Sequence, residues 1–362
     1  MALPLGTQLK MFSYIAGRMA KREARYPLVL MLEPLLACNL ECTGCGKVQH
    51  PPEVLKKRLS PGECWEASME CGAPMVSVAG GEPLLHHQMP EIVEGLIRRG
   101  RHVYLCTNAL LLEKKLPQYR PSPLLTISVH LDGPEHVHDR VVCREGVYRN
   151  ALAAIRSASE QGFSVMINTT IFHGVSPQAY RKWFDECAGL GIRGMMISPG
   201  YPYEKASGGN GFLTADQSKA WFREALFQQY RRKWKFNHSP FYLDFLQGRR
   251  DYNCTPWGIP TRNVFGWQRP CYLLDEGCYA SSYRELLETT PWDEYGPESG
   301  NEHCLDCRVH SGYEPSAVID MFSGPWKFLE MLYEMGTGGR HFPRPEGSGA
   351  QATGKRMPSS RR

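Results

Sequence analysis

Three closely spaced cysteines are the residues of this chain best suited to bind a metal cluster. Cys38, Cys42 and Cys45 are separated by three and then two residues, directly after an apolar run typical of a strand. Thiolates bind iron–sulfur clusters, and a [4Fe–4S] cluster normally takes four of them. Three ligands from one loop leave one iron open to a substrate or cofactor, much as catalytic zinc keeps an open position. A zinc knuckle is the alternative, but it needs a fourth local ligand, and the nearest histidine is His50 in a proline-rich stretch.

A glycine pair and a carboxylate follow the next apolar run, in the segment Gly80-Gly81-Glu82-Pro83. Glycines at the end of a strand let a ligand approach the backbone closely. Glu82 places a carboxylate beside that backbone, where it could meet an ammonium group. Taken alone, the segment is more simply interpreted as an ordinary turn between a strand and a helix.

Six short β-rich runs alternate with helical stretches along the first 200 residues. The runs are Leu28–Leu36, Met75–Ala79, His102–Thr107, Leu124–Leu131, Ser164–Thr170 and Gly194–Ser198. The helical stretches include Pro61–Cys71, Met89–Arg99, Val147–Gln161 and Pro177–Leu190. Such alternation predicts βα units around a parallel sheet. We therefore expect an α/β fold: a partial (β/α)6 TIM-like barrel with an irregular C-terminal extension rich in cysteine and aromatic residues. The chemistry of such a barrel lies at the C-terminal ends of its strands.

Composition divides the 362 residues into four expected segments. Residues 1–25 predict a basic amphipathic helix, residues 26–235 the barrel, residues 236–335 the extension, and residues 336–362 a disordered basic tail. The formal net charge is +5, and the basic excess lies in the two terminal segments. This distribution argues against a nucleic-acid groove in the body and suits adhesion to an acidic membrane surface. The N-terminal helix could equally pack on the body or cap the base of the barrel.

Neither a membrane span nor a secretory signal is expected. No run of about 18 uncharged apolar residues occurs, and the N-terminus lacks an apolar stretch followed by a small-residue cleavage site. We expect a cytoplasmic protein, peripheral at the inner face of the membrane. Its 13 cysteines are then reduced and available for metal binding or catalysis rather than disulfides.

The cysteine loop together with the glycine-rich segment resembles the radical S-adenosylmethionine (SAM) superfamily, which has a CxxxCxxC loop and a GGEP segment after the second strand. The resemblance implies a [4Fe–4S] cluster whose open iron chelates SAM and which cleaves it to methionine and a 5′-deoxyadenosyl radical. The implied cluster ligands are Cys38, Cys42 and Cys45, and the implied cofactor contacts begin with Gly80, Gly81 and Glu82. Further candidates for binding SAM stand at later strand ends: Thr107, Asn108, Ser128, Arg144 and Asn168.

A second set of cysteines stands in the extension and comprises Cys254, Cys271, Cys304 and Cys307. The spacing from Cys254 through Gly258 and Gly266 to Cys271 resembles the opening of auxiliary-cluster domains found in many radical SAM enzymes. Four thiolates could complete a second [4Fe–4S] cluster or a zinc site. Buried structural thiols are the alternative, because the later cysteine-rich part of that pattern is thinned out.

Longer strings indicate a subgroup of the superfamily. They include Tyr104-Leu-Cys-Thr-Asn-Ala-Leu, Ser128-Val-His-Leu-Asp-Gly, Met195-Met-Ile-Ser-Pro-Gly-Tyr and Asn263-Val-Phe-Gly-Trp-Gln-Arg-Pro-Cys-Tyr. Over about residues 26–318 the chain resembles the adenosylhopane synthase family of hopanoid biosynthesis. The resemblance implies that the 5′-deoxyadenosyl radical adds to the terminal alkene of a hopene (diploptene). A C–C bond forms, the product is adenosylhopane, and SAM is consumed as a substrate.

Such an addition leaves a tertiary carbon radical that needs a hydrogen atom, and a thiol is chemically suited to donate it. Cys106 stands at a strand end, at the predicted reactive mouth of the barrel, and we interpret it as the catalytic donor. A small buried thiol is the alternative. Regular alternation points Cys106 and Thr107 to opposite faces unless the strand has already ended.

The implied partners are a hopene lipid, a reducing electron-transfer protein such as a ferredoxin or flavodoxin, and a membrane surface, with no nucleic acid. An apolar substrate requires a large apolar pocket. The runner-up function is a radical SAM maturase that modifies a peptide with an auxiliary iron–sulfur cluster. Two other classes remain open, namely a membrane-associated iron–sulfur sensor without turnover and a zinc-stabilised binding module.

Overall fold

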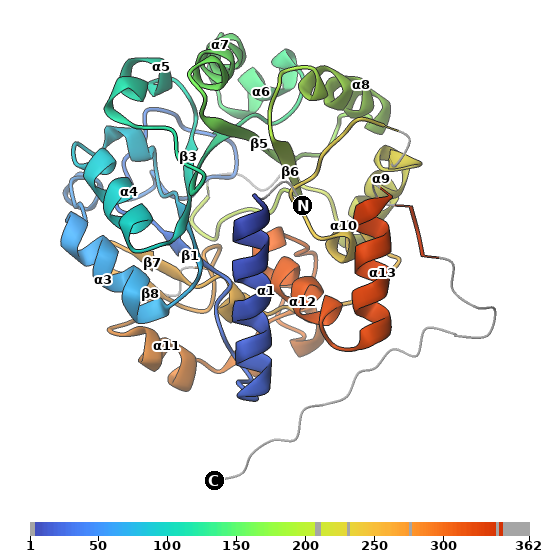
Figure 1. The fold of residues 1–362 in the computed structure, drawn as a ribbon. Helices are drawn as coiled ribbons and strands as arrows, with labels where there is room; N and C mark the ends of the chain where they lie inside the picture. Colours follow the sequence, from blue (N-terminus) through green and yellow to red (C-terminus); the bar gives the residue numbers. More distant parts are fainter. Residues whose placement is uncertain (1–3, 207–210, 230–231, 275–276, 338–339, 343–362) are drawn as a thin grey trace.

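A nine-stranded sheet is the framework of the chain, seen in a computed structural model that describes residues 4–206, 211–229, 232–274, 277–337 and 340–342 (Figure 1). The strand order across the sheet is β6-β5-β4-β3-β2-β1-β7-β8-β9. The bounds are β1 (Val29–Leu32), β2 (Met75–Val78), β3 (His102–Thr107), β4 (Leu125–His130), β5 (Ser164–Ile171), β6 (Gly194–Pro199), β7 (Thr261–Asn263), β8 (Gly266–Gln268) and β9 (Tyr279–Ala280). Each of β1 to β5 pairs in parallel with the next strand along the chain. The predicted partial α/β barrel is confirmed.

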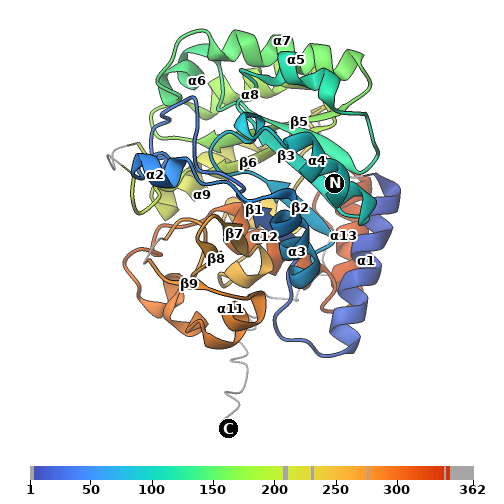
Figure 2. The same ribbon diagram turned by 90° about the vertical axis from the view of Figure 1, so that its left-hand side faces the viewer.

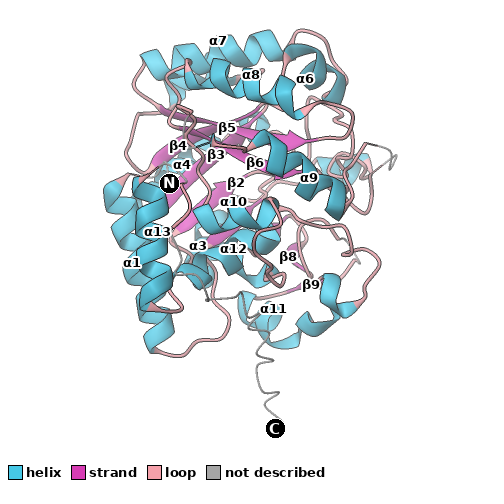
Figure 3. Ribbon diagram, turned by 90° about the vertical axis from the view of Figure 1, so that its right-hand side faces the viewer, coloured by secondary structure: helices cyan, strands magenta, loops and turns pink. Residues whose placement is uncertain are grey.

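Helices cover the outer face of the parallel strands (Figures 2 and 3). Their bounds are α1 (Leu5–Ala20), α2 (Pro52–Leu55), α3 (Pro61–Cys71), α4 (Met89–Arg98), α5 (Leu112–Lys115), α6 (Glu135–Val141), α7 (Val147–Glu160), α8 (Pro177–Ala188), α9 (Ala215–Ala225), α10 (Pro240–Leu246), α11 (Tyr283–Thr289), α12 (His310–Met321) and α13 (Pro325–Gly336). The four predicted helical stretches appear as α3, α4, α7 and α8, within two residues of their expected ends. Each presents buried apolar or small side chains, as an amphipathic helix on a sheet should.

The first strand is shorter than the apolar run from which it was predicted. The expected strand covers Leu28–Leu36, whereas β1 ends at Leu32. Pro34 has no backbone N–H to donate to a sheet ladder, so the regular pairing stops there. The carbonyl groups of Leu35 and Ala37 instead accept hydrogen bonds from Gly81 and Glu82, so the segment after β1 runs against the segment after β2.

The C-terminal extension joins the sheet of the barrel. Strand β7 pairs in parallel with β1, where Met31 lies opposite Thr261, and β8 and β9 follow as antiparallel strands. The composition of this region predicted an irregular structure, whereas the region also contains the short strands β7, β8 and β9. The four segment boundaries remain predictions. Residues 343–362 of the expected disordered tail, together with residues 338 and 339, lie outside the described residues.

Helix α1 closes the end of the barrel at which the parallel strands begin (Figure 1). Met11 and Ile15 are buried against Leu28 and the other apolar residues at the start of the strands. The hydroxyl of Thr7 lies 3.3 Å from Nδ1 of His102, the first residue of β3. Of the alternatives that the sequence left open, the structure therefore has α1 capping the barrel base. No helix in the described part of the chain is long and apolar enough to cross a bilayer.

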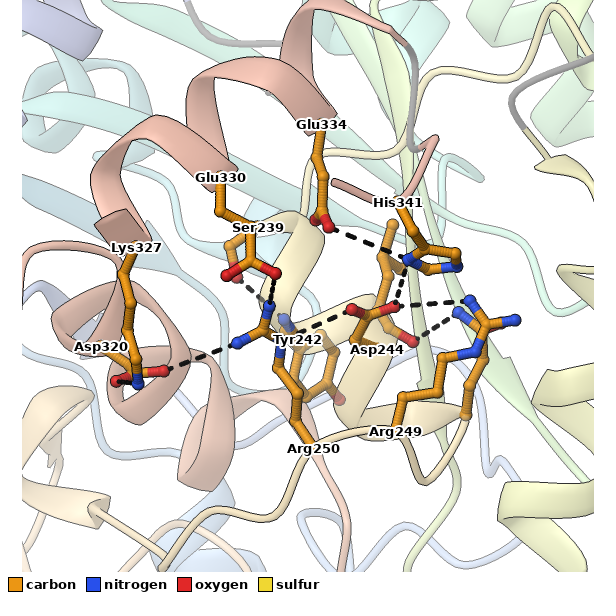
Figure 4. Close-up of polar contacts among 12 residues, drawn as sticks. Ser239, Tyr242, Asp244, Arg249, Arg250, Asp320, Lys327, Glu330, Glu334 and His341 are labelled. Carbon is orange, nitrogen blue, oxygen red and sulfur yellow. Dashed lines mark hydrogen bonds and ion pairs between the residues drawn. The ribbon is translucent and has the colours of Figure 1, made fainter. Parts of the chain in front are cut away.

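An ion-pair network fastens α13 to α10 and α12 near the same end of the molecule (Figure 4). Arg250 lies 3.4 Å from Asp244, 2.8 Å from Glu330 and 3.9 Å from Asp320. Its side chain is 10% exposed, so these charges interact in a poorly hydrated environment. The network fixes the C-terminal helices against the barrel.

Candidate active site

One cavity of about 400 Å³ extends through the interior of the barrel. Its wall at one end is formed by the cysteine loop and by the C-terminal ends of β2 to β6, where such barrels place their chemistry. Its wall at the other end includes residues of α1 and α12. The two ends therefore have different chemical characters, although they belong to one space.

The three cysteines of the first loop line the polar end of this cavity. All are free thiols, and Gly44, with φ of +76°, allows the chain to turn between Cys42 and Cys45. Burial, with the charge of nearby acidic groups, raises the pKa of Cys38 to about 11 and also raises the pKa of Cys42 and Cys45. No three sulfur atoms of described cysteines lie within 4.8 Å of one another. A donor set of three partly buried thiols on one loop fits an iron–sulfur cluster.

The glycine pair lies directly against the cysteine loop. A Cβ atom on Gly80 would stand 2.2 Å from the carbonyl oxygen of Leu35, and one on Gly81 would stand 2.0 Å from that of Ala37. The N–H groups of Gly81 and Glu82 donate to these same two carbonyl oxygens at 3.0 and 2.9 Å. Glycine is thus required here because two backbones touch, and the turn keeps the cysteine loop at the edge of the sheet.

The carboxylate of Glu82 is engaged by the protein itself. It accepts hydrogen bonds from the hydroxyl of Thr107 at 2.8 Å, from the N–H of Asn108 at 2.8 Å and from the N–H of Leu84 at 3.0 Å. Burial raises the pKa of Glu82, and these hydrogen bonds oppose the rise. Glu82 and Thr107 both line the cavity, but their side chains bind each other and hold the ends of β2 and β3 together.

The other predicted site residues fall into two groups. Ser128 and Asn168 line the cavity from β4 and β5, and Asn108 also binds the side chain of Asn39 in the cysteine loop at 2.8 Å. Arg144, in contrast, is exposed and is not part of the cavity wall. All these assignments remain predictions, and the geometry supports the first group more directly.

Cys106 faces the cavity from β3, beside Ser77 of β2. Its sulfur lies 3.3 Å from the hydroxyl oxygen of Ser77. Burial raises the pKa of Cys106, so the thiol keeps its proton near neutral pH. Thr107, the next residue, turns its hydroxyl to Glu82, as strand alternation requires.

A partly buried histidine paired with a buried aspartate at the polar end was only partly predictable from the sequence. Nε2 of His130 lies 2.6 Å from Asp132, and Asp132 accepts the N–H of Thr170 at 2.7 Å. Burial alone would lower the pKa of His130, but the neighbouring carboxylate outweighs burial and raises it. In the sequence, only the polar segment from Ser128 to Asp132 at the end of β4 indicated that functional residues could lie here. Lys47 and Glu33, a buried ion pair of 2.8 Å in the cavity wall, had no signal at all.

The opposite end of the cavity is mainly apolar, although Gln8 and Asn237 also line the cavity. Its walls come from the starts of the strands and from the two helices that close the base, and include Met11, Phe12, Ile15, Leu28, Met75, Tyr104, Val318, Met321 and Phe322. Tyr104 keeps its hydroxyl satisfied by accepting a hydrogen bond from Asn237 at 3.0 Å. Such a surface favours a ligand or ligand part with few polar groups.

The second set of cysteines converges in space, although its members come from three separate segments. Burial raises the pKa of Cys271 to about 11 and that of Cys307 to about 12, and the charge of the neighbouring thiolates contributes in both cases. The pKa of Cys254 is raised by burial and by the charge of the other three thiolates. The donor set suits either a second [4Fe–4S] cluster or a zinc ion.

Two family models match consecutive parts of the chain. The model described as the Radical SAM superfamily matches residues 32–187, which begin at the last residue of β1 and contain the cysteine loop and β2 to β5. A model for a domain of unknown function (DUF3463) matches residues 195–331. A GTP 3′,8-cyclase of Aquifex aeolicus is 31% identical over 146 residues, which are 38% of this chain and 45% of the cyclase. That of Listeria monocytogenes strain EGD-e is 29% identical over 144 residues, 38% of this chain and 43% of the cyclase. The match spans about half the length of these relatives.

Solved structures confirm the fold. SuiB of Streptococcus suis superposes with a TM-score of 0.57 at 14% identity, covering 86% of this chain and 77% of SuiB. The structure described as native anSMEcpe with bound AdoMet and Cp18Cys peptide gives a TM-score of 0.55 at 16% identity, covering 86% and 94%. At these identities the similarity establishes the architecture, and the barrel and extension are both included in it.

Proposed function

Because residues 32–187 match the model of the Radical SAM superfamily, we propose that this chain is an enzyme that joins the 5′-deoxyadenosyl group of SAM to the alkene of a hopene. The supporting observation is the lining of the cavity inside the barrel. Its polar end contains the three cysteines and the glycine-rich segment, and its apolar end has walls of methionine, leucine, isoleucine and phenylalanine. A polar cofactor and an apolar alkene can therefore meet inside one space.

The family implies a [4Fe–4S] cluster and SAM, and the residues present fit both. Cys38, Cys42 and Cys45 supply the thiolates, and the close contact of Gly81 with the loop leaves backbone rather than side chains beside them. When bound, the cluster supplies the electron that cleaves the sulfonium of SAM and releases the 5′-deoxyadenosyl radical. Ser128 and Asn168 offer a hydroxyl and an amide from neighbouring strands to position the polar part of SAM.

Addition and quenching can be written with balanced atoms and electrons. The 5′ carbon of the radical forms a C–C bond to the terminal alkene carbon, and the remaining π electron is left on the tertiary carbon. Cys106 donates the hydrogen atom of its S–H group to that carbon and becomes a thiyl radical. One electron from a ferredoxin- or flavodoxin-type protein and one proton then restore the thiol. The raised pKa of Cys106 suits this role, because only the protonated thiol has a hydrogen atom to give.

A second cluster at Cys254, Cys271, Cys304 and Cys307 is part of the proposal. The ring of Tyr203 stacks edge-on against Tyr272 with centroids 5.4 Å apart. Burial raises the pKa of Tyr203, and the charges of Cys45 and Cys271 contribute to the same rise. Tyr203 thus lies between the two cysteine sets, which supports a second cluster within the reach of electron transfer to the first. Iron analysis of the Cys271→Ser variant tests this part separately, with loss of about half of the bound iron expected.

The first experiment is an anaerobic incubation of reconstituted protein with SAM, a strong reductant and a hopene in detergent. Mass spectrometry then searches for an adduct with the summed mass of hopene, the 5′-deoxyadenosyl group and one hydrogen. Free 5′-deoxyadenosine without adduct would keep the SAM chemistry but contradict the hopene substrate. Peptide modification would then become the leading function, and the solved structures of SuiB and anSMEcpe described with bound peptides give it a starting point.

The role of Cys106 is tested with Cys106→Ala and, as matched control, Cys187→Ala. Cys187 is buried in α8 and lies outside the cavity. We expect Cys106→Ala to cleave SAM while the saturated adduct falls by about 100-fold, in line with the loss of one essential transfer group. An unchanged yield of saturated adduct would remove Cys106 from the mechanism.

A further inference from the structure

We propose that the base of the barrel, where the parallel strands begin, docks on an anionic lipid bilayer and that α1 separates the bilayer from the apolar end of the cavity. The second half of this inference rests on the proposed function, because it makes this base the entrance for the apolar substrate. The docking itself rests on three features of the surface and interior, described next.

The first feature is an exposed apolar patch on α1 and α13, here called the α1–α13 patch and made up of Leu9, Trp326, Leu329 and Leu332. The exposed fractions of these side chains are 58%, 74%, 48% and 45%. Both helices lie on the same face in Figure 1, with α12 between them. Phe12 of α1 joins them, with its ring 6.5 Å from that of Phe328. Large apolar side chains gathered on one face mark an interaction surface.

The second feature is positive charge on the connections that enter the parallel strands. Because β1 to β6 are parallel, these connections all lie at the base. The connections considered are residues 98–101, 119–124, 160–163 and 189–193, and they contain one acidic residue, Glu160. Their five arginines, here called the basic rim, are Arg98, Arg99, Arg101, Arg120 and Arg193. The ammonium group of Lys10 on α1 donates to the carbonyl oxygen of Gly100, so the patch and the rim belong to one face.

The third feature is the cavity directly beneath α1. Met11, Phe12 and Ile15 of this helix form part of the apolar cavity wall, whereas Leu9 and Lys10 face outward. One helix thickness therefore separates the apolar patch outside from the apolar space inside. A movement of α1 away from α12 would join the two without exposing the polar end of the cavity.

An acidic bilayer matches both chemical characters of this face. Apolar side chains can enter the boundary between headgroups and acyl chains, and basic side chains attract anionic headgroups. A nucleic acid would match the basic rim but would gain nothing from the exposed leucines and tryptophan. A second copy of the chain would cover the apolar patch but would bring two basic rims together, which is unfavourable.

The experiment measures binding of the full-length reconstituted protein to vesicles by co-sedimentation. Vesicles of phosphatidylcholine alone are compared with vesicles that contain about 30 mole per cent phosphatidylglycerol, which gives them a negative surface potential like that of a cytoplasmic leaflet. We expect partition to the anionic vesicles to be at least about tenfold higher and to fall as salt is raised. The patch variant carries Leu329→Glu with Leu332→Glu, and the control is Phe227→Glu, since Phe227 is 57% exposed and stands outside the patch.

The patch variant should lower partition to anionic vesicles by about tenfold or more, while the control stays at the wild-type value. Both variants change exposed side chains, so their melting temperatures should remain those of the wild type. Wild-type binding by the patch variant would overturn the docking surface. Equal partition to neutral and anionic vesicles would overturn the role of the basic rim. Protein dimers that disappear in the patch variant would identify a second copy as the occupant and overturn the proposal.

Substrate entry is tested by supplying the hopene in two forms. The patch variant should form adduct from detergent-solubilised hopene at the wild-type rate and lose about tenfold with hopene in vesicles, in step with its loss of binding. Equal loss in both forms would contradict entry through this face. Vesicle binding that follows the expected pattern without any adduct would refute the proposed function and leave the docking surface standing.

Discussion

Gly81→Ala tests whether the backbone after β2 must touch the cysteine loop for a cluster to be held. A Cβ on Gly81 would lie 2.0 Å from the carbonyl oxygen of Ala37 and 2.4 Å from its carbonyl carbon. Both are backbone atoms, so rotation of a side chain cannot relieve the contact. The two segments must move apart by about 1 Å to reach the 3.0 Å below which Cβ contacts are essentially never found.

A separation of that size would break two hydrogen bonds. The N–H of Gly81 donates to Leu35 at 3.0 Å and the N–H of Glu82 donates to Ala37 at 2.9 Å, and both distances would exceed the usual limit. A hydrogen bond contributes about 1 kcal/mol, and a buried polar group left without a partner costs about as much again. We therefore expect the free energy of unfolding to fall by about 3 kcal/mol.

The assay is iron bound per chain after anaerobic reconstitution, together with the midpoint of urea unfolding of the unloaded protein. Gly17→Ala is the matched control, because Gly17 stands inside α1 with no atom within 4 Å of its added Cβ. The control should be more stable by about 0.5–1 kcal/mol and bind iron normally. Wild-type stability and iron content in Gly81→Ala would refute the argument from backbone contact.

Three further predictions concern the ion-pair network, the buried histidines and the apolar cavity end. Arg250→Met leaves Asp244 and Glu330 without their shared cation and should lower the free energy of unfolding, measured by urea titration, by about 3–5 kcal/mol. The control Arg284→Met breaks an exposed ion pair on α11 and should change that free energy by less than about 0.5 kcal/mol. Burial lowers the pKa of His102 to about 4 in the folded chain. Below about pH 6.5 the imidazole therefore binds a proton in the unfolded chain but stays neutral in the folded chain. Stability is then lost as pH falls, by about 2 kcal/mol between pH 7 and pH 5, and His102→Gln should flatten that slope in urea midpoints. Met75→Trp places a larger side chain in the apolar end of the cavity. It should abolish formation of the adduct while free 5′-deoxyadenosine is still released. Adduct formation at the wild-type rate would contradict the proposed position of the alkene.

The parallel part of the fold could be predicted because its signals are local. The run His102–Thr107 forms β3 without a shift in either bound, since most of its residues are apolar or β-branched and all but Cys106 are buried. Strand β7 shows the opposite case. It is Thr-Arg-Asn in sequence, with no apolar pattern, and it is a strand because it lies against β1. These residues form a strand because they pair with β1, which is far away in the sequence. Local strand propensity does not predict such long-range pairing.

The candidate site divides in the same way. The cysteine loop and the glycine pair could be found because their spacing is contiguous in the chain. The pair of His130 and Asp132 depends on the bend after β4, and Lys47 meets Glu33 only because the loop folds back over β1. Arg144 shows the limit of proximity in sequence: it follows the end of β4 along the chain, yet it is exposed and does not line the cavity, so its assignment stays a prediction.

The position of Cys106 follows from the geometry of β3. Tyr104 and Cys106 both line the cavity, and residues two apart on one face of a strand lie about 7 Å apart along it. Tyr104 belongs to the apolar end, while Thr107 binds Glu82 at the polar end. The sulfur of Cys106 therefore lies where the polar wall gives way to the apolar wall. In the proposed reaction, an alkene held in the apolar end would present its terminus at this boundary, where a radical formed at the polar end would meet it. A thiol displaced by two residues in either direction would face only one of the two reactants.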